Sequence, residues 1–205
     1  MSEYLFFGDS ITSAENNNFN GFVEKLDLNS YKNYGVSGTC FGSYSLYPVM
    51  DNNFIDLIDK YKDEIKQAKY MFIEYGCNDI SSLVCKYTTM NHIKIDIIKS
   101  LDYIKQLNSD IKIFLGDKNI NTFARGQCIY LSHDYLKKHI SCFKWILYYK
   151  MLSKFIKSIN KNILYLTEDC ITCEYIDVDG IHPNDRGYEM ISKNIKKEME
   201  EYLCQ

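Results

Sequence analysis

The sequence is poor in the residues that interrupt regular structure. It contains 2 prolines and 10 glycines, whereas average usage would give about 10 prolines and about 14 glycines in a chain of this length. Arginine and alanine are scarce too, with 2 and 3 copies, a bias that an AT-rich coding sequence explains. The hydrophobic content of 46% and the charged content of 25% are average, so collagen-like, disordered and purely coiled-coil proteins are excluded.

Several functional classes also lack support. The net charge is −3 and the isoelectric point is about 5.8, so there is no polycationic surface of the kind that binds nucleic acid. Glu3 stands where a signal peptide carries basic residues, and the longest strongly apolar run elsewhere, at 145–149, cannot span a bilayer. We therefore expect a cytoplasmic protein without a membrane span, and its oligomeric state stays open.

The eight cysteines do not indicate a metal site or a disulfide framework. In a reducing compartment they would be thiols, mostly buried as small hydrophobic residues. Cys170 and Cys173 form one CxxC without a second pair or a spaced histidine. Because structural zinc needs four ligands, we expect no metal.

Short apolar runs alternate with segments of helical periodicity. The expected strands are 4–7, 31–34, 70–75, 111–115 and 163–166, and the expected helical segments are 51–61, 91–107, 131–159, with a break, and 185–203 capped by Asn184. This alternation predicts a parallel sheet covered by helices on both faces. The length suits one domain over residues 1–205.

Three of the expected strands end in a glycine followed by compact polar residues. These ends are Gly8-Asp9-Ser10, expected as a loop, and the segments 35–38 and 76–79. Right-handed crossovers bring the carboxyl ends of parallel strands to one edge, where such sheets bind ligands. The three segments are therefore expected to meet.

The residue types at this edge suit acyl transfer. A serine hydroxyl such as that of Ser10 is a poor nucleophile until a base takes its proton. Asp179 and His182 are three residues apart, so a turn can set the carboxylate against one ring nitrogen and leave the other to face a serine. Gly38 and Asn78 are of the types that donate hydrogen bonds to an oxyanion.

Four segments together resemble the SGNH (GDSL-type) hydrolases. The matching residues are GDSIT at 8–12, NYGVSG at 33–38, GCND at 76–79 and DGIHPNDRGY at 179–188. These are the family's diagnostic blocks in their usual order. The G-x-S-x-G elbow of ordinary α/β-hydrolases is absent. The resemblance implies a flavodoxin-like, three-layer α/β/α fold with about five parallel strands.

The resemblance also implies a role for each residue of the site. Ser10 would be the nucleophile, His182 the general base and then acid, and Asp179 the residue that orients it. The Ser10 backbone N–H, the Gly38 N–H and the Asn78 side chain would form the oxyanion hole. Gly35 is the rival of Gly38, which is preferred because the family's glycine closes the "xSG" turn.

Each of these residues has an ordinary alternative. Ser10 could cap a turn, Asp179 and His182 could be surface residues, and Asn78 could belong to a turn. The four blocks occurring together argue against these alternatives. A catalytically silent ligand-binding protein on the same fold remains the hypothesis from another class, although a binder has no need for an aligned base.

The expected activity is that of a serine esterase acting on a small-molecule ester, without metal or organic cofactor. Short-chain esters, above all acetyl esters, on a sugar or another small alcohol, are the first expectation. A lysophospholipase, a thioesterase-like acyl hydrolase or an O-acyltransferase is the alternative. Arg125 lies in the aperiodic segment 116–130, and we hypothesise that it contacts an anionic part of the substrate. The alternative is an ordinary exposed arginine.

Overall fold

A computed structural model describes residues 3–43, 53–117, 142–160, 162–165, 173–179 and 182–203. Five strands form one sheet in the order β2-β1-β3-β4-β5, and each neighbouring pair is parallel. The strands are β1 (Tyr4–Gly8), β2 (Tyr31–Gly35), β3 (Tyr70–Glu74), β4 (Lys112–Asp117) and β5 (Ile163–Tyr165). This is the flavodoxin-like order, so the expected fold class is confirmed.

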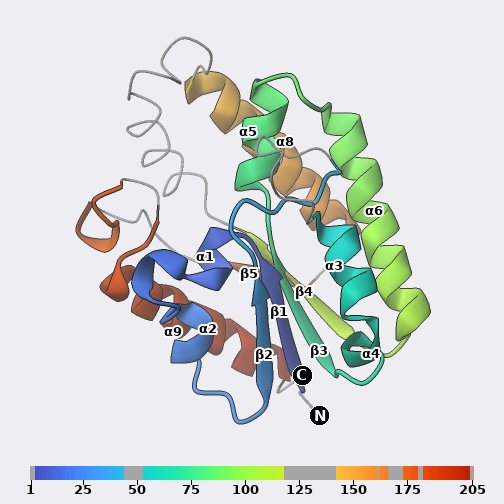
Figure 1. The fold of residues 1–205 in the computed structure, drawn as a ribbon, viewed down its shortest axis with the longest axis vertical. Helices are drawn as coiled ribbons and strands as arrows, with labels where there is room; N and C mark the ends of the chain where they lie inside the picture. Colours follow the sequence, from blue (N-terminus) through green and yellow to red (C-terminus); the bar gives the residue numbers. More distant parts are fainter. Residues whose placement is uncertain are drawn as a thin grey trace.

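Helices cover both faces of the sheet (Figure 1). On one face lie α1 (Ser10–Ser13), α2 (Phe22–Lys25) and α9 (Asp185–Leu203). On the other lie α3 (Phe54–Lys60), α4 (Lys62–Ile65), α5 (Cys77–Val84), α6 (Met90–Leu107) and α8 (Cys142–Ile159). Two short 3-10 helices, η1 (Glu15–Asn17) and η2 (Cys173–Tyr175), complete the described elements.

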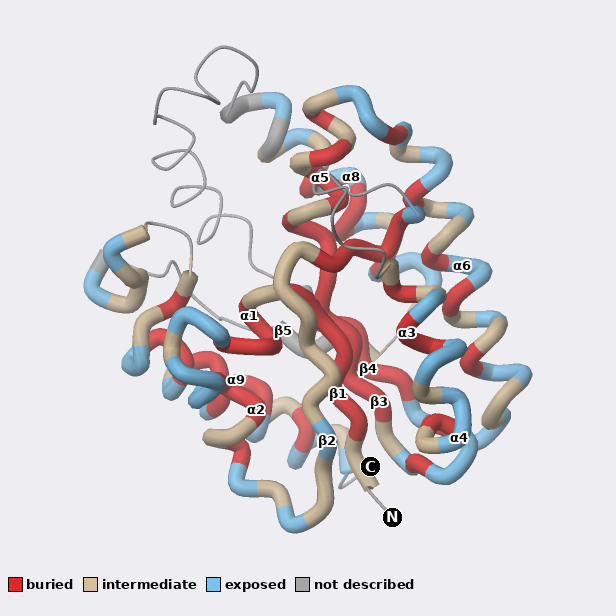
Figure 2. The backbone as a smooth tube through the Cα atoms, viewed as in Figure 1, coloured by how far each residue is buried: buried red, intermediate tan, exposed pale blue. Residues whose placement is uncertain are grey.

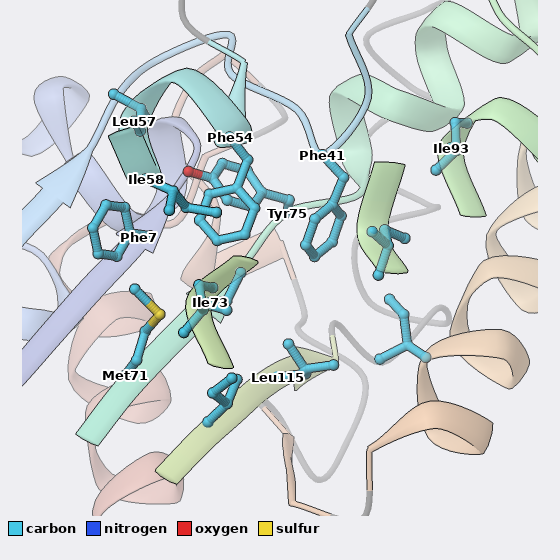
Figure 3. Packing of buried hydrophobic residues seen from close by; sticks show 14 of the residues in the cluster. Phe7, Phe41, Phe54, Leu57, Ile58, Met71, Ile73, Tyr75, Ile93 and Leu115 are labelled. Atoms are coloured by element: carbon cyan, nitrogen blue, oxygen red, sulfur yellow. The ribbon is translucent and has the colours of Figure 1, made fainter. Parts of the chain in front are cut away.

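The central strands supply side chains to a separate core on each face. In β1, Leu5 and Phe7 join the core beneath α3, α4, α5, α6 and α8, while Phe6 joins the core beneath α1, α2 and α9. Strands β1, β3 and β4 are largely buried and the edge strand β2 is only partly so (Figure 2). Figure 3 shows the rings of Phe41 and Phe54 against Tyr75, a cluster below the carboxyl edge of the sheet.

Long periodic segments were predicted well. Helix α9 occupies the expected residues, and the Asn184 side chain caps it by accepting from the Gly187 N–H at 3.1 Å. Helix α6 begins at Met90, one residue before the expected start, because the Thr89 hydroxyl oxygen accepts from the His92 N–H. Helix α8 takes the second part of the expected segment 131–159, and residues 131–141 lie outside the described ones.

The expected loop at Ser10 is instead helical, and a helix that the sequence did not predict follows β3. Ser10 is the first residue of α1 and Cys77 the first of α5, shortly after the ends of β1 and β3. A helix of four residues such as α1 is too short to show periodicity and needs tertiary contacts to form. In the part of the chain that the structure describes, none of the helices has the length and apolarity needed to cross a bilayer.

Candidate active site

The ends of three neighbouring strands meet at the carboxyl edge of the sheet. Gly8 of β1 pairs with Gly35 of β2, and the N–H of Val36 donates to the Gly8 carbonyl at 2.9 Å. On the other side, the Asp9 N–H donates to the Glu74 carbonyl of β3 at 3.2 Å. The register of the strands thus brings together the segments that follow them.

The turn around Ser10 is held by buried polar groups. The Asp9 carboxylate accepts from the Ile11 N–H at 3.0 Å and so caps α1. The Thr12 hydroxyl donates to the buried Glu74 carboxylate at 2.8 Å. Glu74 therefore holds the chain on both sides of Ser10, through its carbonyl before Ser10 and its carboxylate after it.

The end of β2 packs tightly against the same turn. The Asn33 amide donates to the Thr12 carbonyl at 2.9 Å, and its side-chain oxygen accepts from the Gly35 N–H at 2.9 Å. A Cβ at Gly35 would lie 2.4 Å from the Ser13 backbone nitrogen. Gly35 thus permits close packing, and its N–H is bound to Asn33.

A short hairpin before α9 carries the acid and the imidazole. Ile176 and Pro183 form an antiparallel bridge, and the Asp177 N–H donates to the His182 carbonyl at 2.8 Å. One Asp179 carboxylate oxygen accepts from the His182 backbone N–H at 3.0 Å. This bond sets the Asp179 carboxylate beside His182.

The structure brings Ser10, Asp179 and His182 into one hydrogen-bonded chain. His182 Nδ1 lies 2.5 Å from Asp179 Oδ2, and His182 Nε2 lies 2.8 Å from Ser10 Oγ. The side chains of His182 and Asp179 are 21% and 32% exposed. With the Nδ1 proton directed at Asp179, Nε2 presents its lone pair to the serine hydroxyl.

Gly38 and Asn78 lie in segments that are linked to each other. Gly38 has a φ of +79°, which glycine tolerates, in the turn closed by the Thr39 N–H on the Val36 carbonyl. The Asn78 side-chain amide donates to the Thr39 carbonyl at 2.8 Å. That bond uses one amide proton and orients the second.

A buried carboxylate supports this side of the site from below. Asp79 is 1% exposed, and its two oxygens accept from the N–H groups of Phe41 and Gly42 at 3.0 and 2.8 Å. Burial raises its pKa to about 6, although the backbone hydrogen bonds act in the opposite direction. The bonds fasten the segment after Gly38 to the start of α5.

The remaining residues named from the sequence are Arg125 and the cysteines. Arg125 and Cys170 lie outside the described residues, and the first two residues of the segment 116–130 belong to β4. Cys40 and Cys77, which lie close in sequence to the expected oxyanion donors Gly38 and Asn78, are buried. The sequence reasoning missed Glu74, whose signal was a carboxylate at the end of an apolar strand.

A serine hydroxyl, an imidazole and a carboxylate in one hydrogen-bonded chain are typical of serine hydrolases. The family model of GDSL-like lipase/acylhydrolase proteins matches residues 4–195. The chain belongs to this family and is an ester hydrolase. No curated protein matches the chain.

Solved structures of several esterases and lipases share the fold. The lipase Lip_vut3 from a goat rumen metagenome is 17% identical, with 97% of each chain covered and a TM-score of 0.65. The psychrotrophic esterase EstA from Pseudoalteromonas sp. is 15% identical over 100% of both chains, with a TM-score of 0.63. A family two carbohydrate esterase from Clostridium thermocellum is 13% identical over 99% of this chain and 64% of that one, with a TM-score of 0.64.

Proposed function

We propose that this ester hydrolase acts through Ser10 as nucleophile, His182 as general base and acid, and Asp179 as the group that orients the imidazole. The observation that carries the proposal is the chain of contacts from Asp179 Oδ2 through the imidazole to Ser10 Oγ, at 2.5 and 2.8 Å. The contact between His182 Nε2 and Ser10 Oγ is of the length over which a positioned base takes a proton.

Acylation follows from this arrangement. His182 Nε2 takes the Ser10 hydroxyl proton as Oγ bonds to the ester carbonyl carbon, and the carbonyl electron pair moves onto oxygen. When the tetrahedral intermediate collapses, the ester C–O bond breaks and the alcohol leaves with the proton from Nε2. Asp179 stabilises the imidazolium in between.

The negative oxygen of the intermediate needs donors that are already in place. We assign this role to the N–H groups of Ser10 and Gly38 and to the Asn78 amide. Asn78 is supported by its bond to the Thr39 carbonyl, which holds the amide in one orientation. Gly38 is supported by its φ of +79° and by its place directly before Thr39, whose carbonyl accepts from the Asn78 amide.

Deacylation repeats the same proton path with water. His182 takes a proton from water, whose oxygen bonds to the acyl carbon, and the Ser10 Oγ–carbon bond breaks. Ser10 recovers its proton from Nε2, and the carboxylic acid leaves. Acylation and deacylation written in this way require no metal or organic cofactor.

For the substrate we propose short-chain esters, above all acetyl esters, with a carbohydrate as the first candidate for the alcohol. The modest length of the chain supports a small acyl group, and the similarity to a carbohydrate esterase supports a sugar alcohol. A series of p-nitrophenyl esters of increasing chain length, followed by acetylated sugars, tests this. A preference for long acyl chains or thioesters would favour a lysophospholipase or thioesterase-like enzyme instead, and transfer to added sugar hydroxyls would favour an acyltransferase.

A fluorophosphonate tests the nucleophile directly. A phosphonate inhibitor suits this fold, since EstA from Pseudoalteromonas is described as inhibited by monoethylphosphonate. The wild type should gain one covalent adduct by mass spectrometry, and Ser10→Ala should gain none. Labelling of Ser10→Ala, or none of the wild type, would contradict the assignment of Ser10.

A further inference from the structure

Asn16 links the segment after the nucleophile helix to the hairpin that carries His182. It lies in η1, three residues after α1 ends. Its amide nitrogen donates to the Pro183 carbonyl at 3.0 Å and to an Asp177 carboxylate oxygen at 3.3 Å. Its amide oxygen accepts from the Tyr188 hydroxyl at 2.8 Å. One side chain therefore contacts residues on both sides of His182.

The partners of Asn16 lie close to the base in the chain. Pro183 follows His182 directly, and Asp177 is the residue whose N–H binds the His182 carbonyl. The hairpin's own bonds set its internal shape, but they do not set its position relative to α1. Tyr188 belongs to α9, and its side chain is fully buried in the core beneath that helix. Its hydroxyl is therefore held in one position and can orient the Asn16 amide.

We propose that Asn16 and Tyr188 form a positioning pair that sets His182 Nε2 against Ser10 Oγ. The inference rests on the proposed roles of Ser10 and His182. Asn16 suits the task because one planar amide both donates and accepts, so that Tyr188 orients the group which then binds the Pro183 carbonyl. A displacement of about 1 Å at a reacting group can cost on the order of 100-fold in rate.

The adjacent Asn17 provides a matched control. Its amide donates to the Asn20 carbonyl at 2.7 Å and to Asp185 at 3.2 Å. It therefore makes a comparable link from η1 to α9, but to a position beyond the hairpin. An effect that arises merely from loosening η1 should appear in both Asn16→Ala and Asn17→Ala.

The first experiment separates kcat from KM with p-nitrophenyl acetate. Asn16→Ala should lower kcat about 10- to 100-fold with KM within about twofold, since the acyl group binds as before. Tyr188→Phe keeps the buried ring and should lower kcat several-fold. Asn17→Ala should stay within twofold of the wild type. Equal loss in Asn16→Ala and Asn17→Ala, or a change confined to KM, would overturn the proposal.

The second experiment asks whether Asn16 acts through His182. In a His182→Ala background the residual hydrolysis no longer uses the imidazole, so adding Asn16→Ala should change it by less than twofold. A further tenfold loss would show that Asn16 acts elsewhere and would overturn the pair. The fluorophosphonate separates a failure of the proposed function from a failure of the positioning role. If Ser10→Ala is labelled, the proposed function is wrong. If Asn16→Ala is labelled at the wild-type rate, only the positioning role of Asn16 is wrong.

Discussion

The two sides of the site are held in different ways. On the nucleophile side, Asp9 and Thr12 are 1% and 0% exposed and are bound to groups on β3 and α1. On the base side, Val178 is fully exposed, and the side chain of Asp179 is about one third exposed. The nucleophile thus lies at the edge of the buried core, and the base lies on a surface hairpin.

This difference has a structural origin. Strand pairing between β1, β2 and β3 places the nucleophile turn and both donor segments, so their positions depend on the folding of the whole sheet. The hairpin is placed by its own turn and by side-chain links such as Asn16. We therefore expect substitutions on the base side to cost activity with little stability, and those on the nucleophile side to cost both.

The largest effect should come from removing the base. His182→Ala should lower kcat by about 10³-fold or more, because no group then takes the Ser10 proton. The stability should change by only about 0.5 kcal/mol, as for other partly exposed positions. Ester hydrolysis and thermal unfolding measure the two, with His92→Ala on the exposed side of α6 as the control. A large stability loss in His182→Ala would remove the contrast.

The next effect tests the oxyanion donors. Asn78→Ala should lower kcat about 10²- to 10³-fold, the usual result of deleting one such donor. Its KM should change little, because the charge develops only in the transition state. Ser81→Ala on the same helix is the control, since its hydroxyl donates to the Cys77 carbonyl within that helix. A loss confined to KM would mean that Asn78 binds the substrate and does not stabilise the oxyanion.

The buried carboxylate Asp79 should make stability depend on pH. Its pKa in the folded protein, about 6, lies above the ordinary value of 3.8, so the stability from its protonated form is present at low pH. That stability is lost as the pH rises through about 4 to 6, and the loss is about 3 kcal/mol in full.

Urea unfolding of the wild type and Asp79→Asn at several pH values checks this. The wild-type free energy of unfolding, minus that of Asp79→Asn, should decrease from about pH 4 to about pH 7. Taking the difference cancels the other carboxylates, of which Asp63 and Asp185 have lowered pKa values because of their lysine partners. A difference that does not vary with pH would contradict the prediction.

The smallest effect compares one polar residue from each side. Thr12→Val removes the hydroxyl from the buried Glu74 carboxylate and should cost about 1–3 kcal/mol of stability. Thr12→Ser keeps the hydroxyl and should recover part of that loss. Asp179→Asn, on the hairpin, should cost about 0.5 kcal/mol. Urea unfolding measures all three, and equal costs for Thr12→Val and Asp179→Asn would argue against the difference between the two sides.

Much of the fold could be predicted from local pattern. The apolar runs at β1, β3 and β4 and the long periodic helices α6 and α9 were found within a residue or two at most ends. The short helix α1 and the start of α5 were not; α1, for example, depends on the tertiary contact between Thr12 and Glu74. Nothing in the local sequence around Asn16 indicated Pro183 or Tyr188 as its partners, because more than 160 residues separate them.

The sequence by itself determined which residues were available for chemistry and at which strand ends they stand. Alternating periodicity was enough for the layered parallel sheet, and three-residue spacing was enough to join Asp179 to His182. Only the tertiary structure decided which glycine packs against the turn around Ser10 and which carboxylates hold that turn. It also decided how the hairpin that carries His182 is placed against Ser10. These outcomes depend on hydrogen bonds between segments far apart in the chain, and no local pattern encodes their partners.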